Sequence, residues 1–417
     1  MDFQPKSYKK IRQLLEKGVD IRNPGTLDIG DEVNVNHISS RDVKIYPGCR
    51  IYGQKTVISA GSQLGYEAPV TIDNCQLGLN VELKGGYFCQ SIFLDGANMG
   101  MGAHVREGCI LEEQSNGAHS VGLKQTILFP FVTLGSLINF CDCLMAGGTS
   151  CNNHSEVGSS YIHFNFTPDA NKTTPSLIGD VPRGVMLNQP PIFLGGQGGM
   201  VGPLRIGYGN VVAAGSILRQ DYPQNNQLIF DLPQSQGVRD LRPMAYPNFR
   251  RMVENNILYL ANLKALEVWY TQVRKPFFEA QEFGSLIYDG AMNQLSLAGK
   301  ERLKRLKTMA KKPVCPSMKD LKSESINAKQ VLHEHVDDIE AILCEKIQDD
   351  ATHKAQETFL RDFMQSGGNS LTPYIETIQQ LPPDVSAKGV QWLQCIVDYY
   401  CQRISTVLSS ISLFRTL

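Results

Sequence analysis

A repeat of six residues is the feature of this sequence that most restricts its fold. Between about residues 20 and 220, apolar residues recur at intervals of six, in the runs Ile45, Ile51 and Val57; Leu64 and Val70; Leu77 and Leu83; Phe93, Met99, Val105 and Leu111; and Met200, Ile206, Val212 and Leu218. A period of six is neither the 3.6 residues of an α-helix nor the two residues of a simple strand. It indicates a repeat architecture.

The physical form that fits this period is a coil with three flat sides, each side made by one hexad. One aliphatic residue per hexad points inward and stacks on its equivalent in the next coil. The intervals of seven from Val57 to Leu64 and from Val70 to Leu77 indicate one extra residue at a corner. Glycines and asparagines in GDEVNVN, GLNVELKGG and DGANMGMGA supply corner conformations that β-branched residues resist. Because each coil buries its faces only against its neighbours, several coils must stack.

A β-sandwich or barrel is the alternative to this parallel β-helix. Its strands would be spaced at about 8 to 12 residues with longer polar turns, which does not match the hexads. All but six of the 37 glycines lie before residue 240, so a second architecture follows the repeats. The predicted fold class is mainly β plus α, with a β-helix followed by an α-helical C-terminal domain.

Four segments follow from this division. Residues 1–20 carry a short helix, with apolar residues at helical spacing and Gly18 as its C-cap. Residues 21–222 form the β-helix, and residues 223–247, rich in proline, form a linker. Residues 248–417 form an α-helical domain, with helices expected near 249–280, 286–310, 325–348, 351–365 and 385–413.

Composition excludes several classes of protein. A net charge of −1 gives no general attraction to nucleic acid or to lipid headgroups, and we expect neither partner. No run of about 18 apolar residues is present, and the charged N-terminal segment lacks the features of a signal peptide. We therefore expect a cytoplasmic protein whose eleven cysteines are reduced thiols.

The segment FLGGQGGMVGPLRIGYGNVVAAGSIL, residues 193–218, resembles the hexapeptide acyltransferase signature, in which a hydrophobic hexad is followed by an alanine-alanine-glycine corner. The resemblance implies a left-handed β-helix, a homotrimer, and acyl-CoA lying along the groove between two subunits. The residues that match the small positions of that groove are Gly196, Gly202, Ala213 and Ala214. It implies acetyl-CoA as the co-substrate and these four residues as its binding site.

A second segment, SSYIHFNFTPDANKTTPSLIGD, resembles a loop of the acetyltransferase half of the bifunctional N-acetylglucosamine-1-phosphate uridyltransferases. Asn165 matches the asparagine of that loop and Lys172 its lysine, so the resemblance implies that both bind a sugar phosphate or nucleotide sugar. A lysine there is a point-charge partner for phosphate. Phe166 stands where the family has tyrosine, which removes a hydroxyl donor.

The general base is the position at which the sequence departs most from this family. Acetyl transfer to an amine needs a base to take the amine proton, and the family's histidine aligns near Asp142. A carboxylate is a weaker base at neutral pH unless burial raises its pKa. His163 is the alternative, because alternation places it on the same strand face as Asn165, and His154 is a weaker candidate.

No other constellation carries chemistry. Cys141, Cys143 and Cys151 lack the spacing of a zinc site, so we predict no metal. The basic run KERLKRLKTMAKK is interpreted as a solvated helix face. The Gly-rich loop of the uridyltransferase half is found neither in residues 1–20 nor in the helical domain, so no nucleotidyltransferase chemistry is expected.

Three functional hypotheses remain open at this point. The chain is an acyltransferase acting on an amino sugar phosphate or nucleotide sugar, or a non-catalytic relative that binds a nucleotide sugar or displays its helical domain as a scaffold. The third hypothesis is a partner subunit of a separate nucleotidyltransferase.

Overall fold

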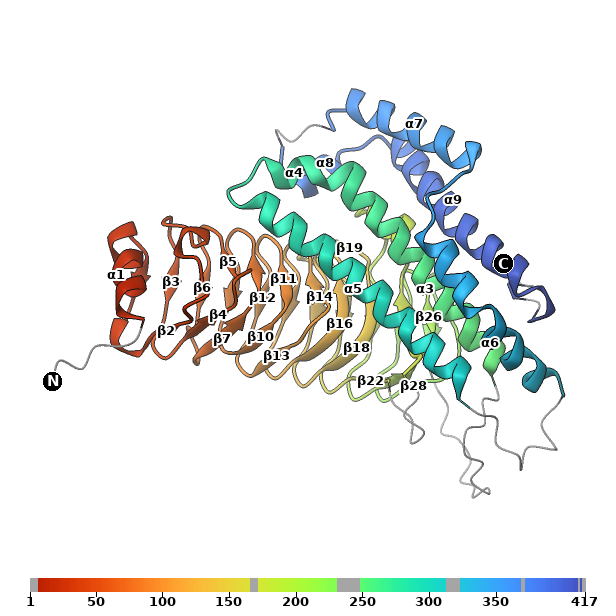
Figure 1. Ribbon diagram of the computed structural model, residues 1–417, viewed down its shortest axis with the longest axis horizontal. Helices are drawn as coiled ribbons and strands as arrows, with labels where there is room; N and C mark the ends of the chain where they lie inside the picture. The colour runs from red at the N-terminus through yellow and green to blue at the C-terminus, as the bar shows by residue number, and fades with distance from the viewer. Residues whose placement is uncertain are drawn as a thin grey trace, which may run out of the picture.

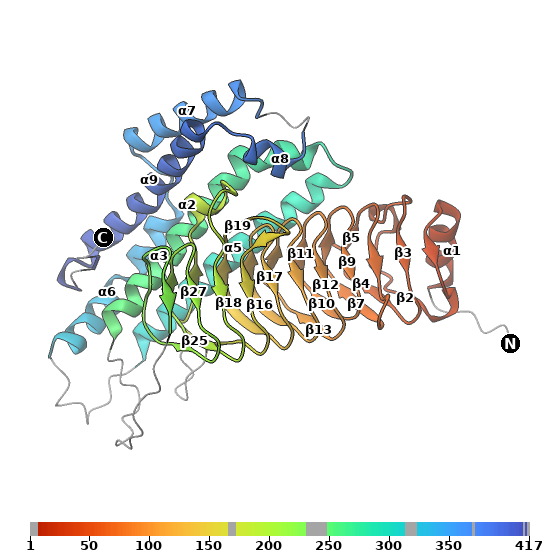
Figure 2. The same ribbon diagram turned by 180° about the vertical axis from the view of Figure 1, so that it is seen from behind.

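The computed structural model describes residues 7–165, 172–230, 248–312, 323–368, 372–411 and 413–414. It is a long left-handed parallel β-helix with a group of helices packed along one side of it (Figures 1 and 2). The β-helix has about 11 turns and is followed by the helical region, so the predicted fold class is confirmed.

Three faces make up the β-helix, and each is a parallel ladder with one short strand per coil. Face 1 contains β1 (Asp20–Ile21), β3 (Lys44–Ile45), β6 (Gln63–Leu64), β9 (Glu82–Leu83), β12 (Asn98–Met99), β15 (Asn116–Gly117), β17 (Thr133–Leu134), β21 (Glu156–Val157), β24 (Phe193–Leu194), β27 (Val211–Val212) and β29 (Leu228–Ile229). Face 2 contains β2 (Asp28–Ile29), β4 (Arg50–Tyr52), β7 (Val70–Asp73), β10 (Gly86–Cys89), β13 (Ala103–Val105), β22 (Ile162–Phe164), β25 (Gly199–Val201) and β28 (Ile217–Leu218). Face 3 contains β5 (Val57–Ile58), β8 (Gln76–Leu77), β11 (Ser91–Phe93), β14 (Cys109–Leu111), β23 (Ser176–Ile178) and β26 (Arg205–Ile206).

Two longer strands, β16 (Gly122–Leu128) and β18 (Asn139–Met145), run through the corner between faces 2 and 3. Gln125 and Asp142 sit at this corner with φ of 51° and 64°, in the left-handed region. In earlier coils Asn74 and Gln90 take the same conformation, with φ of 53° and 45°. Side chains of polar residues therefore project from this corner in coil after coil.

The residues of the six-residue repeat form the core. Ile45 pairs with Leu64, and Leu64 pairs with Leu83, so the inward residue of one coil lies directly on that of the next. Every residue of the predicted repeat is buried. Each such side chain contributes roughly 1.5–3 kcal/mol by leaving water.

The last strand extends face 1 beyond the predicted end of the repeats. Leu228 pairs with Val211, and Ile229 pairs with Val212 and is buried. The ladder thus continues into the range 223–247 that the sequence analysis assigned to a linker. A projection also leaves the coil as the two-stranded antiparallel sheet of β19 (Gly148–Ser150) and β20 (Asn153–His154).

The first helix, α1 (Tyr8–Lys17), closes the N-terminal end of the β-helix (Figure 1). Ile11 and Leu14 are buried, and Gly18 ends the helix in the left-handed conformation with φ of 98°. Lys17 donates from Nζ to the carbonyl oxygens of Val35 and Ile38, which satisfies groups at the open end of the first coil.

The remaining helices are α2 (Val181–Gly184), α3 (Phe249–Trp269), α4 (Lys275–Glu279), α5 (Gly284–Lys311), α6 (Ser323–Cys344), α7 (Asp350–Gln365), α8 (Tyr374–Gln379) and α9 (Pro383–Val407), with a π-helical turn at Tyr270–Arg274. Helices α3 and α5 lie against face 3, where α5 contacts β8, β11 and β14 and α3 contacts β23. Helices α6 and α9 pack against α3, and α7 packs against α9 (Figure 2). Within the described part of the chain, no helix is both long and apolar enough to cross a bilayer.

Buried asparagines on α3 bind it to the β-helix. Asn262 Oδ1 accepts the backbone N–H of Val181 at 2.9 Å, and Asn256 Nδ2 donates to the carbonyl oxygen of Thr173 at 3.2 Å. Buried polar groups are costly unless they are paired, so these bonds fix where α3 docks as well as holding it there.

Candidate functional site

Asp142, at the corner between faces 2 and 3, is at the centre of the candidate site. Its Oδ1 lies 2.7 Å from a terminal guanidinium nitrogen of Arg302 on α5, and both side chains are almost fully buried, with 6% and 3% exposed. Its Oδ2 accepts hydrogen bonds from Asn165 Nδ2 and Thr174 Oγ1, each at 3.2 Å. Both carboxylate oxygens are therefore engaged by the protein itself.

His163 lies in β22 and points into the β-helix, with 2% of its surface exposed. Its Nδ1 is 2.5 Å from the carbonyl oxygen of Cys141, which can only accept, so Nδ1 carries the proton. Its Nε2 then accepts from Ser176 Oγ at 2.9 Å, and Ser176 in turn accepts the N–H of Leu204. Burial lowers the pKa of His163 to about 4, so the ring is neutral at pH 7.

The two expected sugar-phosphate residues lie on either side of residues 166–171. Both Asn165 and Lys172 are half-buried. Asn165 donates a hydrogen bond to Asp142. Phe166, the residue that departs from the family's tyrosine, lies outside the described residues. The structure therefore brings Asp142 and Asn165 into contact.

His154 belongs to a separate place, the β19–β20 projection. Its Nδ1 donates to the carbonyl oxygen of Cys151 at 2.6 Å, and its Nε2 is 3.6 Å from a carboxylate oxygen of Glu156. These contacts hold the tip of the projection.

Three of the four small residues share the corner between faces 1 and 2. Gly196 accepts the N–H of Gly215 at 2.9 Å, and a Cβ added to neighbouring Gly195 would lie 2.4 Å from the backbone nitrogen of Ala214. Ala213 is half-buried and Ala214 is exposed, so this corner presents backbone and methyl groups to solvent. Gly202 lies elsewhere, where an added Cβ would come within 2.6 Å of His163 Nε2.

The cysteines near the site do not gather around a metal position. Cys143 donates from Sγ to the carbonyl oxygen of Cys141 at 3.6 Å, and burial raises the pKa of both thiols. Cys151 is exposed on the projection. Among the described residues no group of three or more His, Cys, Asp or Glu side chains could hold a metal ion.

Two residues of the site were missed in the sequence. Thr174 follows Lys172 in an unremarkable polar run, and Arg302 lies within the basic segment that we interpreted as a solvated face. That interpretation is wrong for Arg302, because the α5 face that carries it is turned toward face 3. The flanking Leu303 and Leu306, which are both buried, were the available signal that part of this segment faces a core.

Known proteins include relatives of this chain that match about half of its length. No family model matches the chain. A protein named bifunctional protein GlmU from Thermotoga maritima is 30% identical over 216 residues, which is 52% of this chain and 43% of that protein. About half of this chain is homologous to GlmU.

Other relatives with the same name match at similar levels. GlmU of Carboxydothermus hydrogenoformans is 28% identical over 216 residues, and GlmU of a Nostoc species is 28% identical over 217 residues. The chain spans less than half of the length of these relatives, 43% in each case. The resemblance to this family expected from the two sequence segments is therefore confirmed.

Proposed function

We propose that this chain is a hexapeptide-repeat, acyltransferase-like relative of the enzymes of amino sugar synthesis. In this proposal it binds a sugar phosphate or nucleotide sugar without catalysing acyl transfer through Asp142 or His163. The ion pair between Asp142 and Arg302 is the observation that carries the proposal. Homology to GlmU supports the class of ligand.

The argument against turnover is one of access. A general base must come within about 2.6–3.2 Å of the proton it takes. Asp142 has both oxygens engaged, and His163 has both ring nitrogens engaged inside the β-helix. Neither side chain can meet a substrate amine while α5 lies over the corner.

Calorimetry and a thiol assay on the full chain test this proposal together. We expect heat of binding with UDP-N-acetylglucosamine, weakened by Lys172→Ala, and no release of free thiol from acetyl-CoA with glucosamine 1-phosphate. Lys304→Ala, at an exposed position of α5, is the matched charge-removal control and should bind normally. Absence of binding, or thiol release that depends on Asp142 or His163, would overturn the proposal.

An active acyltransferase is the second candidate, favoured by the corner of Gly196, Ala213 and Ala214. Its small residues leave room for an acyl-CoA chain to lie against the backbone, and acetyl-CoA is the expected co-substrate. In this case acetyl-CoA should bind to the chain, and replacing Ala214 with Trp should block it. Thiol release that disappears in His163→Ala or Asp142→Ala would establish this candidate in place of the first.

A homotrimer is proposed for both candidates. Phe193, Val211 and Leu228 stack in register on the outer side of face 1 and are 39%, 43% and 66% exposed, an apolar strip suited to contact between subunits. Light scattering should give about three times the chain mass of 46.2 kDa, whereas the monomer mass would contradict the proposal.

We also propose a cytoplasmic location, which cell fractionation would test.

A further inference from the structure

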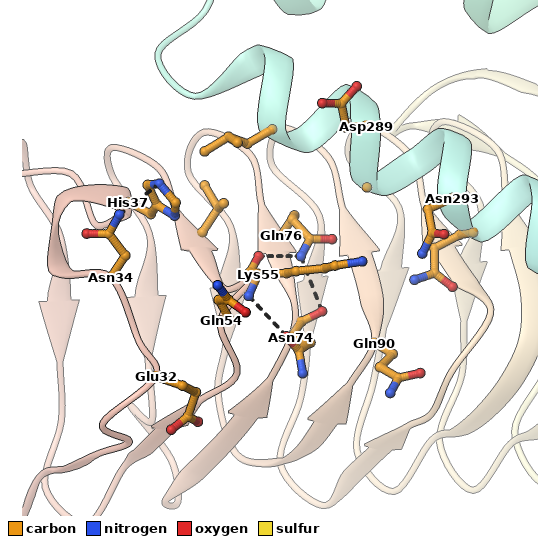
Figure 3. Close-up of a pocket in the computed structure, with 14 residues that line it drawn as sticks. Glu32, Asn34, His37, Gln54, Lys55, Asn74, Gln76, Gln90, Asp289 and Asn293 are labelled. Carbon is orange, nitrogen blue, oxygen red and sulfur yellow. Dashed lines mark hydrogen bonds between the residues drawn. The ribbon is translucent and has the colours of Figure 1, made fainter.

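A cleft lined mainly by polar side chains lies between the first coils of the β-helix and the N-terminal half of α5. These coils precede the coil that carries Asp142. Its volume is about 760 Å³, within the range of small-molecule binding sites. Figure 3 shows Gln76 and Gln90 on the coils and Asn293 extending from α5 toward them. The proposed function does not use any of these residues.

The walls of this cleft are held in place at both ends. At one end Glu282, just before α5, accepts hydrogen bonds from Ser39 Oγ and from a terminal guanidinium nitrogen of Arg41, each at 2.8 Å. At the other end buried Gln294 accepts the N–H of Gly108 at 3.1 Å. The cleft is therefore formed before any ligand arrives, which reduces the entropy lost on binding.

Gly290 sets the distance between the two walls. A Cβ added to this residue would lie 2.5 Å from Gln76 Oε1 and 2.9 Å from Ile92 Cδ1. Gln76 and Ile92 are both buried, so a larger residue here would have to displace these side chains or move α5 away from the coils. The cleft thus lies beside a close contact between the backbone of α5 and these two side chains.

Side-chain amides dominate the lining, supplying seven of its 14 residues. Some of them are held by the protein: Gln76 Nε2 donates to the carbonyl oxygens of Lys55 and Asn74, and Asn74 Oδ1 accepts the N–H of Lys55 at 3.0 Å. Asn34 Nδ2 similarly donates to His37 Nε2 at 3.1 Å. These fixed amides give the coil wall a definite pattern of donors and acceptors.

Gln54, Gln90 and Asn293 form a second group, exposed in the cleft. Each offers two N–H donors and one carbonyl acceptor. Gln90 stands beside Asn74 at the corners of neighbouring coils, because the preceding residues Cys89 and Asp73 are paired, and adjacent strands lie about 4.8 Å apart. Donors and acceptors are thus repeated at a regular interval along the cleft.

The charge and polarity of the lining narrow the class of ligand. Two carboxylates, Glu32 and Asp289, outnumber the single ammonium group of Lys55, which disfavours phosphates and other anions. Apolar side chains are few, with Val57 and Leu286 as the aliphatic ones, which disfavours a lipid. Paired donors and acceptors without strong charge suit a ligand that carries many hydroxyl groups.

We propose that the cleft between the first coils and α5 binds a neutral saccharide, whose hydroxyl groups bond to the amides of Gln54, Gln90 and Asn293. The saccharide lies along the corner between faces 2 and 3 and is covered on one side by α5. This site is independent of the one proposed at Asn165 and Lys172.

The test titrates the full chain with three neutral trisaccharides: triacetylchitotriose, maltotriose and cellotriose. We expect calorimetric binding of at least one, together with slower hydrogen exchange in residues 286–294 when it is present. The double variant Gln54→Met and Asn293→Leu keeps side-chain size but removes amides, and it should bind about tenfold or more weakly. Gln402→Met, at an exposed position of α9, is the matched control and should bind as the unchanged chain does.

Three results would overturn the proposal. They are no binding of any trisaccharide with a Kd below about 10 mM, equal binding by the double variant, and binding of an extended peptide such as hexaglycine in place of the sugars. Both altered positions are exposed, so unchanged thermal melting will verify that the variants fold. Because UDP-N-acetylglucosamine binding is measured with Lys172→Ala, failure of either site is distinguishable from failure of the other.

Discussion

Arg302 of α5 and Asp142 of β18 form a buried ion pair across the boundary between the helical region and the β-helix, with 2.7 Å between nitrogen and oxygen. The aspartate stands where the acetyltransferase family is expected to carry its base, and the arginine comes from a helix 160 residues further along the chain. The helical region therefore provides the partner of the residue that most affects the functional interpretation.

Breaking this pair from the arginine side should destabilise the protein strongly. Arg302→Met leaves a buried carboxylate without its counter-ion, which costs about 3–5 kcal/mol in the free energy of unfolding. Urea denaturation measures this loss. Lys307 lies on the same helix as Arg302, and Lys307→Met removes an exposed pairing with Asp337 and Glu340 of α6, so it should change stability by about 1 kcal/mol or less.

Replacing both partners distinguishes an ion pair from simple packing. The double variant Asp142→Asn with Arg302→Met removes both charges, so it should recover a large part of the stability lost in Arg302→Met. Equal losses in the single and double variants would show that the instability of Arg302→Met does not come from leaving the carboxylate of Asp142 without its counter-ion.

A second buried cluster should make stability depend on pH. In it Arg274 of the π-helical turn pairs with Glu112 and Glu113 of the coils and lies over the ring of Tyr374 in α8. The pKa of Glu113 is raised to about 7, chiefly by burial and further by the negative charges of Glu112 and Asp95. The positive charge of Arg274 opposes this rise. Between its ordinary value near 4.5 and pH 7 the folded state holds a proton that the unfolded state has lost. Its contribution to stability is thus lost as pH rises through this window.

Comparison with Glu113→Gln isolates this effect. The unchanged protein should lose stability relative to the variant as pH rises from about 4.5 to about 7, measured by urea denaturation at each pH. Glu112, whose pKa is also raised by burial, is present in both proteins. A stability difference that does not vary with pH would contradict the buried position of Glu113.

His163 should remain neutral well below the pH at which histidines ordinarily become charged. With a pKa lowered by burial to about 4, its contribution to stability is present above pH 6.5 and is lost as pH falls toward 4. NMR of labelled histidine should show a ring protonated only on Nδ1 at pH 5.5. A titration midpoint above pH 6 would mean that the ring reaches solvent.

Two glycines of α5 should respond in opposite directions to alanine. Gly299 has open space where a Cβ would lie, so Gly299→Ala should stabilise the helix by up to about 1 kcal/mol. Gly290→Ala places a methyl group against Gln76 and Ile92 and should cost about 1–3 kcal/mol. Thermal unfolding measures both changes, and a stabilising Gly290→Ala would show that α5 is not held against the coils.

The β-helix could be predicted from sequence because its repeat is local. Ile45, Leu64 and Leu83 stack at equivalent positions of successive coils, and this spacing is visible in one dimension. The long helices after residue 248 were also predictable from their periodicity, whereas the short helix α8 was not predicted. Where these helices dock was not, since contacts such as Asn262 to Val181 depend on a shape that exists only after folding.

The site shows the same limit. Asp142, His163 and Asn165 were selected by motif, but the motif says nothing of what covers them. Arg302 belongs to a segment whose other charged residues are exposed, such as Lys304, or half-buried, such as Arg305, so composition alone suggested a solvated face. The saccharide cleft combines coil corners with α5, and neither sequence segment indicates it alone.

The release of free thiol from acetyl-CoA in the presence of glucosamine 1-phosphate tests the central claim most directly. With α5 covering Asp142, and His163 bonded inside the β-helix, the full chain should release thiol no faster than buffer while still binding UDP-N-acetylglucosamine. Turnover above that background, abolished by Asp142→Ala or His163→Ala, would contradict the account.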